Sequence, residues 1–556
     1  MFFVMLFILF VILTSDYSVY NMDRKEKNIY GGDFMKKIGL ILIILTAALA
    51  LAFISCKKEP AKPAQIIVEI FDRGTDGGRS LAYDNAWTDW VKEKVKKDLN
   101  IEVTFMPVGR WSEETDIVNL MASASAPDLC YTYSTAMVNT FRDQGGIIDL
   151  APYVEKILPD MKKLLGADPA LQGKDFIYRN LQQDGKMYSI PSYRVALAIR
   201  NIFIRKDWLD KLGLPLPANM EQFHNALIAF RDRDPGNVGR SRVIPLATDA
   251  GARWRLADFV NNYLPANMSD RDRYVYNANL GNRRISHPGI KEGVRVMNQW
   301  FSEGLIYRDF PVMRNADDIL NIIKSGVVGA FSGNWDEPYR TDYKILEELR
   351  RNVPGADFVP LDITNNKEIY DKVGLQIFIP AFSKNRDAAL KYLNWLSIPE
   401  NFQFLQRGQE GVNHTLVDGI PRMMTRPAGD PWFQNSTQNI DITMPMNGLE
   451  MGSEELNARV LALSYGGYAP EIIVNAYQTS VRNGRASVVV PGVITTQDGI
   501  YGQIINDKAD ALIAQAITAR PADFDRVWDT GLADWMSSGG QAVQDERAAI
   551  AGTVWK

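Results

Sequence analysis

An alternation of strand-like and helix-like stretches near the start of the polar chain constrains the fold more than any other feature. β-Branched or aromatic runs predict three strands, at Gln65–Phe71, Ile101–Phe105 and Leu129–Tyr133. Between them, apolar residues recur at helical spacing within Tyr83–Leu99, and again at Ile117, Leu120 and Met121. Strand–helix–strand repetition with short joins predicts βαβ units, a parallel sheet and the α/β class.

The alternation of predicted strands and helices continues through the rest of the chain. An extended stretch is expected over Ser189–Arg205 and a strand over Gln376–Ile379. Helices are expected at Asp207–Leu212, Met220–Phe230, Lys291–Glu303 and Ala388–Trp395. Ligands of parallel sheets bind beyond the carboxyl ends of the strands. The loops after the first three strands therefore make Asp72, Arg73, Trp111 and Tyr133 candidate ligand contacts.

Composition excludes several classes of function. The 556 residues are enough for two large lobes or several ordinary domains. With 62 Lys and Arg against 66 Asp and Glu, the chain has no basic excess, which argues against nucleic-acid binding. Two cysteines exclude a disulfide framework, and three dispersed histidines leave little for metal or triad chemistry. The common nucleotide, zinc-protease and hydrolase motifs are absent, so no cofactor or metal is expected.

The N-terminal region has the anatomy of a secretion signal over residues 35–55. Lys36-Lys37 precede an uncharged apolar run, and Ser55-Cys56 come before an abruptly polar segment. This order resembles a bacterial lipobox in relaxed form, which makes Cys56 the expected lipidated N-terminus of a membrane-anchored, extracytoplasmic protein. Residues 56–64 are the expected tether. A transmembrane anchor is the alternative, although the apolar run is at the lower limit for spanning.

Residues 1–34 do not fit this signal. Their apolar start has no cationic flank and is too short to span a bilayer. We therefore expect translation to begin at Met35, with residues 1–34 an upstream extension of the reading frame.

Several further segments carry a resemblance to a known family. They are Ala126–Leu129 (APDL), Gly185–Pro191 (GKMYSIP), Arg205–Leu214 (RKDWLDKLGL), Lys324–Ala330 (KSGVVGA) and Gly411–Pro421 (GVNHTLVDGIP). In this order, and with the lipobox, they resemble family 1 extracellular solute-binding lipoproteins of ABC importers. The LipO-like branch, which includes alginate-oligosaccharide-binding proteins, is the most similar. The family usually has a tyrosine where this chain has His414.

The resemblance implies a type II periplasmic-binding-protein-like fold, in which crossing hinge strands join two α/β lobes around a ligand cleft. The implied N-terminal lobe comprises residues 65–190 and about 366–415, and the C-terminal lobe residues 191–365 and about 416–556. The implied function is capture of a carbohydrate, with an oligosaccharide favoured, and its delivery to the permease subunits by a monomeric binding protein. Neutral oligosaccharide, uronate and peptide all remain open as ligands.

The resemblance also directs attention to Trp335, which aligns with a sugar-stacking tryptophan of maltose-binding-type proteins. An aromatic plane beside carboxylates suits a saccharide, and the GNWDEP context predicts a loop with a partly exposed ring. Asp336 and Glu337 are the expected acceptors for sugar hydroxyls. Trp254 is a further candidate contact, and Arg73 could meet either an anionic sugar or a surface carboxylate. Trp87 and Trp90 are expected to be core residues because they lie at helical spacing.

The segment Asp234–Pro245 resembles the family's calcium loop in degenerate form. Aligned without gaps, only Asp234 is kept, and the other ligand positions hold Gly236, Val238, Arg242 and Val243. Calcium requires six to eight oxygen ligands. We therefore expect no metal here, with Arg242 pairing with a nearby carboxylate.

Two alternative functions remain open on the sequence. A surface glycoside hydrolase would need two carboxyl groups about 5–9.5 Å apart, a distance that sequence does not give. A ligand sensor for a receptor or kinase would share the two-lobed fold.

Overall fold

The computed structural model describes residues 62–74, 77–168, 171, 173–276, 285–340, 343–434, 439–465, 467–490, 493 and 495–555. The chain divides into two compact units, Met1–Pro63 and Ala64–Lys556, and every element described below belongs to the second. The predicted extension, signal peptide and lipidated Cys56 lie outside the described residues. No helix among the described residues is both long enough and apolar enough to cross a membrane.

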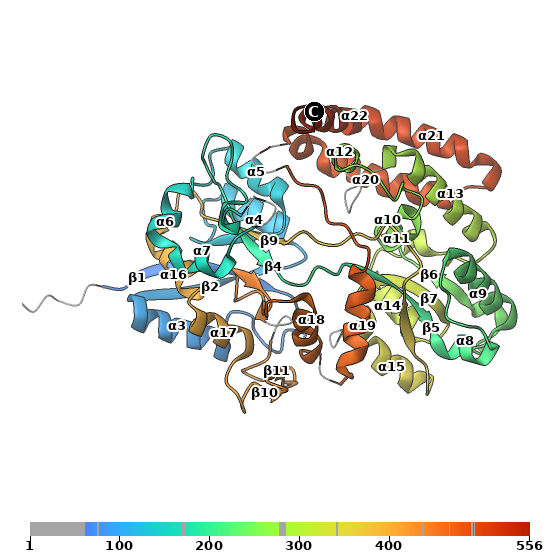
Figure 1. The fold of residues 1–556 in the computed structure, drawn as a ribbon, viewed down its shortest axis with the longest axis horizontal. Coiled ribbons are helices and arrows are strands. Elements are labelled where there is room, and N and C mark those ends of the chain that lie inside the picture. Colours follow the sequence, from blue (N-terminus) through green and yellow to red (C-terminus); the bar gives the residue numbers. More distant parts are fainter. Residues whose placement is uncertain are drawn as a thin grey trace, which may run out of the picture. The chain divides into compact units, whose positions relative to one another are not determined.

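The first lobe is built on a mixed sheet (Figure 1). Strands β1 (Ala64–Asp72) and β2 (Ile101–Gly109) pair in parallel over their whole length. A parallel bridge from Val68 to Leu129 joins β1 to the start of β3 (Cys130–Thr132). β9 (Val373–Phe378) then runs antiparallel between β3 and β4 (Ile190–Arg194), and β12 (Met446–Asn447) lies beside β4. The predicted parallel strands are thus present, with one antiparallel strand inserted from a distant part of the chain.

Helices cover this sheet and bury its apolar residues. They are α3 (Ala86–Leu99), α4 (Glu113–Ala122), α5 (Thr135–Asp143), α6 (Val154–Ile157), α7 (Pro159–Leu165), α16 (Arg386–Leu396) and α17 (Pro399–Arg407). Asn85 starts α3 with a capping box in which its side chain accepts from the Trp87 and Thr88 amides. Trp87 is 2% exposed, which confirms its predicted place in the core. A hairpin of β10 (His414–Val417) and β11 (Ile420–Met423) follows α17.

The second lobe has its own four-stranded sheet in the order β6-β7-β5-β8. β5 (Arg200–Arg205) runs antiparallel to both of its neighbours, β7 (Val328–Asn334) and β8 (Phe358–Leu361). β6 (Ile244–Ala247) is parallel to β7. β5 is fully buried along its length, with the apolar Ile202, Phe203 and Ile204 at its centre and the polar Arg200, Asn201 and Arg205 toward its ends.

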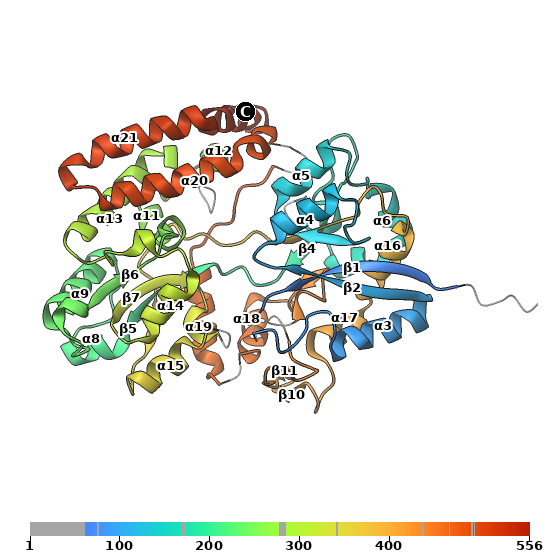
Figure 2. The same ribbon diagram turned by 180° about the vertical axis from the view of Figure 1, so that it is seen from behind.

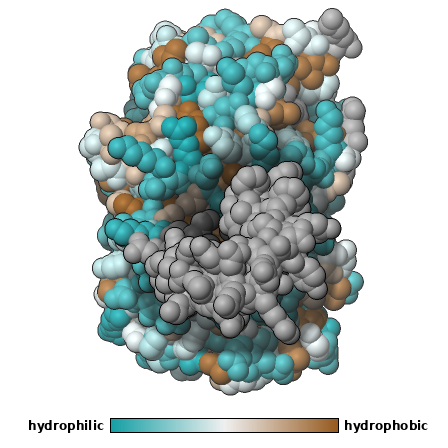
Figure 3. Space-filling model, turned by 90° about the vertical axis from the view of Figure 1, so that its left-hand side faces the viewer, coloured by the Kyte–Doolittle hydropathy of each residue, from teal (hydrophilic) through white to brown (hydrophobic). Residues whose placement is uncertain are grey.

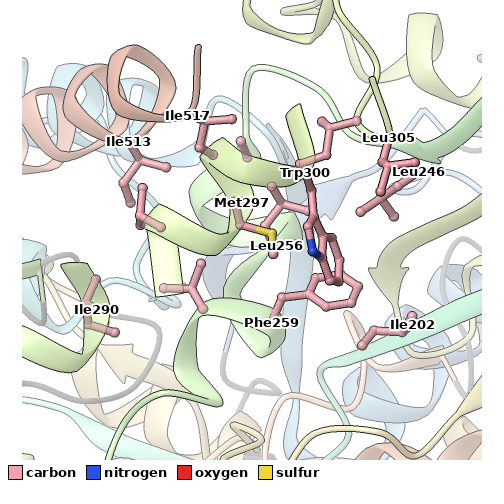
Figure 4. Packing of buried hydrophobic residues seen from close by; sticks show 14 of the residues in the cluster. Ile202, Leu246, Leu256, Phe259, Ile290, Met297, Trp300, Leu305, Ile513 and Ile517 are labelled. Atoms are coloured by element: carbon pink, nitrogen blue, oxygen red, sulfur yellow. The ribbon is translucent and has the colours of Figure 1, made fainter. Parts of the chain in front are cut away.

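Thirteen helices of the described residues belong to this lobe and to the long C-terminal layer beside it (Figures 1 and 2). They are α8 (Lys206–Leu212), α9 (Met220–Arg233), α10 (Ala252–Arg255), α11 (Ala257–Asn261), α12 (Asp270–Val275), α13 (Pro288–Ser302), α14 (Ala316–Lys324), α15 (Ile345–Asn352), α18 (Glu454–Leu463), α19 (Pro470–Val481), α20 (Thr496–Thr518), α21 (Phe524–Trp535) and α22 (Gln541–Val554). Met297 and Trp300 of α13 pack in one core with Ile513 and Ile517 of α20 (Figure 4). The C-terminal helices therefore complete the core of the second lobe.

Three segments cross between the two sheets, and they contact one another. The first follows β4, the second joins β8 to β9, and the third follows β12. The Arg194 amide donates to the Lys372 carbonyl at 2.6 Å, and the Tyr370 amide donates to the Leu197 carbonyl at 2.9 Å. The Val195 amide donates to the Asn447 side chain at 3.0 Å, which brings the third segment to the same place.

The third crossing lies later in the chain than expected. Ile442 and Met444 pack in the core of the first lobe, and β12 pairs with β4. The expected boundary near residue 415 is therefore wrong, because the chain completes the first sheet at Asn447 before it enters the second lobe at α18.

On the face of the first lobe shown in Figure 3, hydrophilic residues predominate and hydrophobic ones are scattered among them. No large apolar patch gathers on the visible part of this face, as is usual for a protein surface in water.

Glu69 is a buried carboxyl group in the first sheet. Its side chain is 0% exposed and accepts a hydrogen bond from the Tyr131 amide at 2.9 Å, while Oε1 has no partner among the described residues. Burial raises the pKa of Glu69 well above its ordinary value; the Tyr131 amide opposes this rise and the nearby charge of Glu113 adds to it. The folded protein thus holds this carboxyl group protonated at a pH where the unfolded chain has released the proton.

Glu69→Gln is expected to stabilise the protein at neutral pH. Because the folded pKa is raised, stability is greatest below the unfolded pKa and falls as the pH rises above it toward the folded value. An uncharged amide removes that loss, so we expect the unfolding free energy at pH 7 to increase. Urea unfolding at pH 4 and pH 7 measures it. The gain should largely disappear at pH 4, and an equal gain or a loss at both pH values would contradict the assignment.

Candidate ligand-binding cleft

A cleft of about 1020 Å³ is lined by residues of both lobes. Arg73, Trp111 and Arg194 line it from the first lobe, and Trp335 and Asp336 from the second. The segment 423–428 and residues 432–434 form a further part of its wall. Of the eight residues predicted as ligand contacts, four therefore line this cleft and four do not.

Trp335 lies immediately after β7 and is buried rather than partly exposed. Its amide donates to the Ile199 carbonyl at 3.0 Å, and its side chain is 8% exposed. Tyr465 and Tyr477 contact the indole edge to face, at centroid distances of 5.9 and 5.5 Å. The expectation of a partly exposed ring is wrong, because two tyrosines from the far C-terminal part of the chain cover it. Only a small part of Trp335 can reach a ligand.

Asp336 is also engaged within the protein. Its carboxylate accepts a hydrogen bond from the Tyr465 hydroxyl at 2.5 Å and forms an ion pair with Arg340 at 3.5 Å. The side chain is 5% exposed in the wall of the cleft. Asp336 therefore holds Tyr465 in place beside Trp335.

Glu337 does not line the cleft. It is 1% exposed and forms an ion pair with Arg255 at 3.1 Å, while its other oxygen accepts from the Asn334 amide at 2.7 Å. Arg255 also pairs with Asp249 at 2.6 Å. Burial by itself lowers the pKa of Arg255, but the two carboxylates outweigh this and raise it above its ordinary value. The structure thus assigns Glu337 to a buried charge network, contrary to the expectation that it accepts sugar hydroxyls.

Arg73 lines the cleft but already has a carboxylate partner. Its Nε and Nη2 atoms each donate to Asp441 at 2.7 Å, and both side chains are mostly buried. Burial lowers the pKa of Arg73, and Asp441 more than restores it. The neighbouring Asp72 is exposed, accepts from the Gly74 amide at 3.0 Å, and is absent from the cleft wall.

Trp111 is the most exposed of the predicted contacts. Its side chain is 75% exposed at the edge of the cleft, with the Arg110 guanidinium 5.1 Å from its ring. Arg110 also lies 4.5 Å from the ring of Tyr133, which is itself outside the cleft wall. An exposed indole held by a guanidinium suits stacking on a flat ligand.

Trp254 lies against a second buried charge network, away from the cleft wall. The Arg200 guanidinium is 5.5 Å from its ring, and Arg200 pairs with Asp258 at 2.9 Å and Glu368 at 2.6 Å. Burial lowers the pKa of Arg200, and the two carboxylates raise it overall. Trp254 therefore covers a structural ion cluster.

Sequence reasoning missed two residues at the crossing segments, Arg194 and Tyr370, both of which line the cleft. Arg194 is the last residue of β4, where the chain leaves the first sheet. The prediction of one continuous extended stretch gave no position for this departure. A basic residue in the middle of that stretch was the available signal.

Basic residues outnumber acidic ones in the wall of the cleft, eight to three, although the whole chain carries a charge of −4. The basic ones are Arg73, Arg79, Arg194, Lys324, Arg340, Lys344, Arg350 and Arg426. The acidic ones each have a partner: Asp336 pairs with Arg340, Glu347 with Arg351, and Glu348 with Lys324. A pair of unengaged carboxyl groups, which a glycoside hydrolase would need, is not found among these lining residues.

The degenerate calcium loop is closed by hydrogen bonds within the chain. The Asp234 carboxylate accepts from the Val238 amide at 3.0 Å and from the Gly239 amide at 2.8 Å. No group of three or more His, Cys, Asp or Glu side chains suited to a metal occurs among the described residues. Asp234 is the single carboxylate of the segment Asp234–Pro245, and calcium sites usually combine several carboxylates with other oxygen ligands.

Millimolar calcium, or a chelator, is therefore expected to leave the melting temperature unchanged. A ligand that binds only the folded state raises the melting temperature more as its concentration exceeds its Kd, so the comparison is sensitive. Scanning calorimetry with and without calcium measures it, and magnesium controls for ionic strength. A rise specific to calcium would contradict the assignment.

The chain matches the family model of the bacterial extracellular solute-binding proteins over residues 79–401. This match covers more than half of its length. The chain belongs to this family. Solute-binding proteins of this family are binding proteins rather than enzymes, and their two-lobed fold agrees with the two sheets and three crossings described above.

Curated solute-binding relatives include the lipoprotein LipO of Bacillus subtilis, with 28% identity over 342 residues, 58% of this chain and 62% of LipO. The fructooligosaccharide ABC transporter substrate-binding protein FusA of Streptococcus pneumoniae is 27% identical over 34% of this chain and 36% of FusA. The polygalacturonan/rhamnogalacturonan-binding protein YtcQ of Bacillus subtilis is 22% identical over 57% of this chain and 62% of YtcQ. The alignments thus span less than two thirds of each of these relatives.

Solved structures of solute-binding proteins show the same fold. FusA from S. pneumoniae in complex with kestose has a TM-score of 0.63 at 15% identity, covering 88% of this chain and 99% of that one. The alginate-binding protein AlgQ2 without calcium ion has a TM-score of 0.59 at 16% identity, covering 89% and 99%.

Proposed function

We propose that this chain captures an oligosaccharide in the cleft between its lobes and delivers it to the permease of an ABC importer. The observation that carries the proposal is the cleft of about 1020 Å³, with an exposed tryptophan at its edge and hydrogen-bonding side chains in its wall. This volume suits a ligand of several sugar rings, and aromatic faces beside polar groups suit sugars. The carbohydrate-binding relatives FusA and YtcQ support the same reading.

A thermal-shift screen over a panel of neutral and acidic oligosaccharides tests this function. A ligand that binds only the native state at 100 times its Kd adds about 2.7 kcal/mol of stability, which is easily seen as a rise in melting temperature. Release of reducing ends during incubation would instead show a hydrolase. Absence of any shift across the panel would reject saccharide capture.

We also propose that the protein acts as a monomer anchored to the membrane by a lipid on Cys56. LipO, a lipoprotein by name, and the lipobox-like order of residues support this proposal. A single acyl chain binds membranes only marginally, so firm retention requires more than one chain.

Cys56→Ser is expected to leave the protein unprocessed or to release it from the membrane. The serine lacks the thiol that accepts the lipid. Membrane fractionation with intact mass spectrometry measures both the location and the added mass, and Cys130→Ser is the matched control, since Cys130 is a buried free thiol. A Cys56→Ser protein that is still cleaved and membrane-bound would reject the lipid anchor.

A further inference from the structure

We propose that the cleft is specific for an acidic oligosaccharide and that Arg194 binds one of its carboxylate groups. This inference rests on the proposed function and narrows its substrate class. Arg194 is a cation in the cleft wall, and the described part of the chain provides no counter-charge for it.

Arg194 lies where the three crossing segments meet. Its amide donates to Lys372, and the next amide, of Val195, donates to Asn447. These two hydrogen bonds, one to a backbone carbonyl and one to the Asn447 side chain, fix the position of the residue. Its side chain lines the cleft.

The Arg194 guanidinium lies close to two tyrosine rings. The group lies 4.2 Å from the ring centre of Tyr370 and 5.4 Å from that of Tyr133. Tyr133 in turn contacts Arg110 at 4.5 Å, and Arg110 contacts the exposed Trp111 at 5.1 Å. Guanidinium groups and aromatic rings therefore alternate from the crossing segments to Trp111 at the edge of the cleft. Aromatic contacts of this kind restrict a guanidinium without using up its capacity to bind a carboxylate.

Among the described residues, no carboxylate forms an ion pair with Arg194, and its buried Nε has no hydrogen-bond partner. Other arginines of the wall differ in this respect, since Arg73 pairs with Asp441 and Arg350 with Asp357. A partly buried guanidinium without a counter-ion is unfavourable, and a bound carboxylate would relieve this.

A carboxylate fits this group better than a hydroxyl does. The planar guanidinium can donate two parallel N–H bonds to one carboxylate, whereas a sugar hydroxyl offers a single neutral acceptor. The surplus of basic residues in the wall adds attraction for an anion at longer range. A uronic acid provides both the carboxylate and the flat apolar face that Trp111 can stack on.

Calorimetric titration of the purified full chain tests the proposal with charge-matched ligands. The probes are oligosaccharides of galacturonate, glucuronate and mannuronate, together with their methyl esters and neutral hexose counterparts. We expect at least one acidic series to bind, and its methyl ester to bind roughly 10- to 100-fold more weakly, as for loss of a charged hydrogen bond. This comparison uses the unmodified protein and needs no variant to fold.

Arg194→Gln should remove most of the difference between acid and ester, and Arg194→Lys should restore only part of it. Arg520→Gln is the matched control, because it makes the same substitution at an exposed arginine that does not line the cleft. It should change the affinity less than about 3-fold, as expected for an exposed charge away from the ligand. An equal loss with Arg520→Gln, or no effect of Arg194→Gln, would overturn the assignment to Arg194.

The failures of the two proposals are distinguishable. Equal binding of acids, esters and neutral sugars would overturn the acidic class and leave saccharide capture standing. Absence of binding to every saccharide would overturn the proposed function itself.

Discussion

Replacing Glu337 by alanine is expected to lower the free energy of unfolding by about 3–5 kcal/mol, as is usual when one partner of a buried ion pair is removed. The Arg255 guanidinium would keep Asp249 but lose its second carboxylate, and the Asn334 amide would lose its acceptor. Both changes leave polar groups in a site that water does not reach. Urea unfolding measures the loss.

Glu347→Ala is the matched control for Glu337→Ala. Glu347 also pairs with an arginine, but both side chains are more than half exposed, at 59% for Glu347 and 67% for Arg351. Exposed pairs contribute about 0–1 kcal/mol, so little change is expected. If the two variants lost similar stability, or if Glu337→Ala weakened only ligand binding, the structural role of Glu337 would be wrong.

Trp335→Ala is expected to lower the free energy of unfolding by about 3–5 kcal/mol, the usual loss for a large aromatic residue removed from a core. The indole fills the space between Tyr465 and Tyr477 and is 8% exposed. Removing it would also leave the Tyr465 ring without its neighbour at the wall of the cleft. Denaturant unfolding beside calorimetric titration separates the loss of stability from any loss of binding.

Two further variants sharpen this result. Trp335→Phe keeps most of the packing and should lose clearly less stability. Trp111→Ala removes a 75% exposed ring and should change stability by no more than about 0.5 kcal/mol while weakening saccharide binding. The reverse pattern, with Trp335→Ala stable and unable to bind, would restore Trp335 as the main sugar platform.

The local elements of the first lobe could be predicted well from the sequence. Residues at helical spacing identified α3, and β-branched runs identified β1 and β2, because these signals depend on neighbours in the chain. The stretch Ser189–Arg205 was less clear. It forms β4 and β5 in two different sheets, and its division depends on contacts with residues far away, such as Lys372.

The candidate site was only partly predictable for the same reason. The GNWDEP segment has the composition of an exposed loop, yet Arg255 neutralises Glu337 from 82 positions away and Tyr465 covers Trp335 from still farther. Arg194 showed the opposite error. The basic residue marked the position, but its place in a cleft depends on crossing segments that come from distant parts of the chain.

The position of β9 has a consequence for how the chain acquires its structure during synthesis. β9 lies between β3 and β4, so strands ending at Thr132 and Arg194 cannot be joined into one sheet before Phe378 has been made. The first sheet is complete only when its last strand, which ends at Asn447, has been synthesised. The core of the second lobe also requires the helices that begin at Thr496. Neither lobe can complete its folding early in synthesis. The many long-range contacts also predict slow folding. A partly made chain would therefore expose unfinished sheet edges for most of its synthesis, which favours a route in which folding begins only once the whole chain has been released.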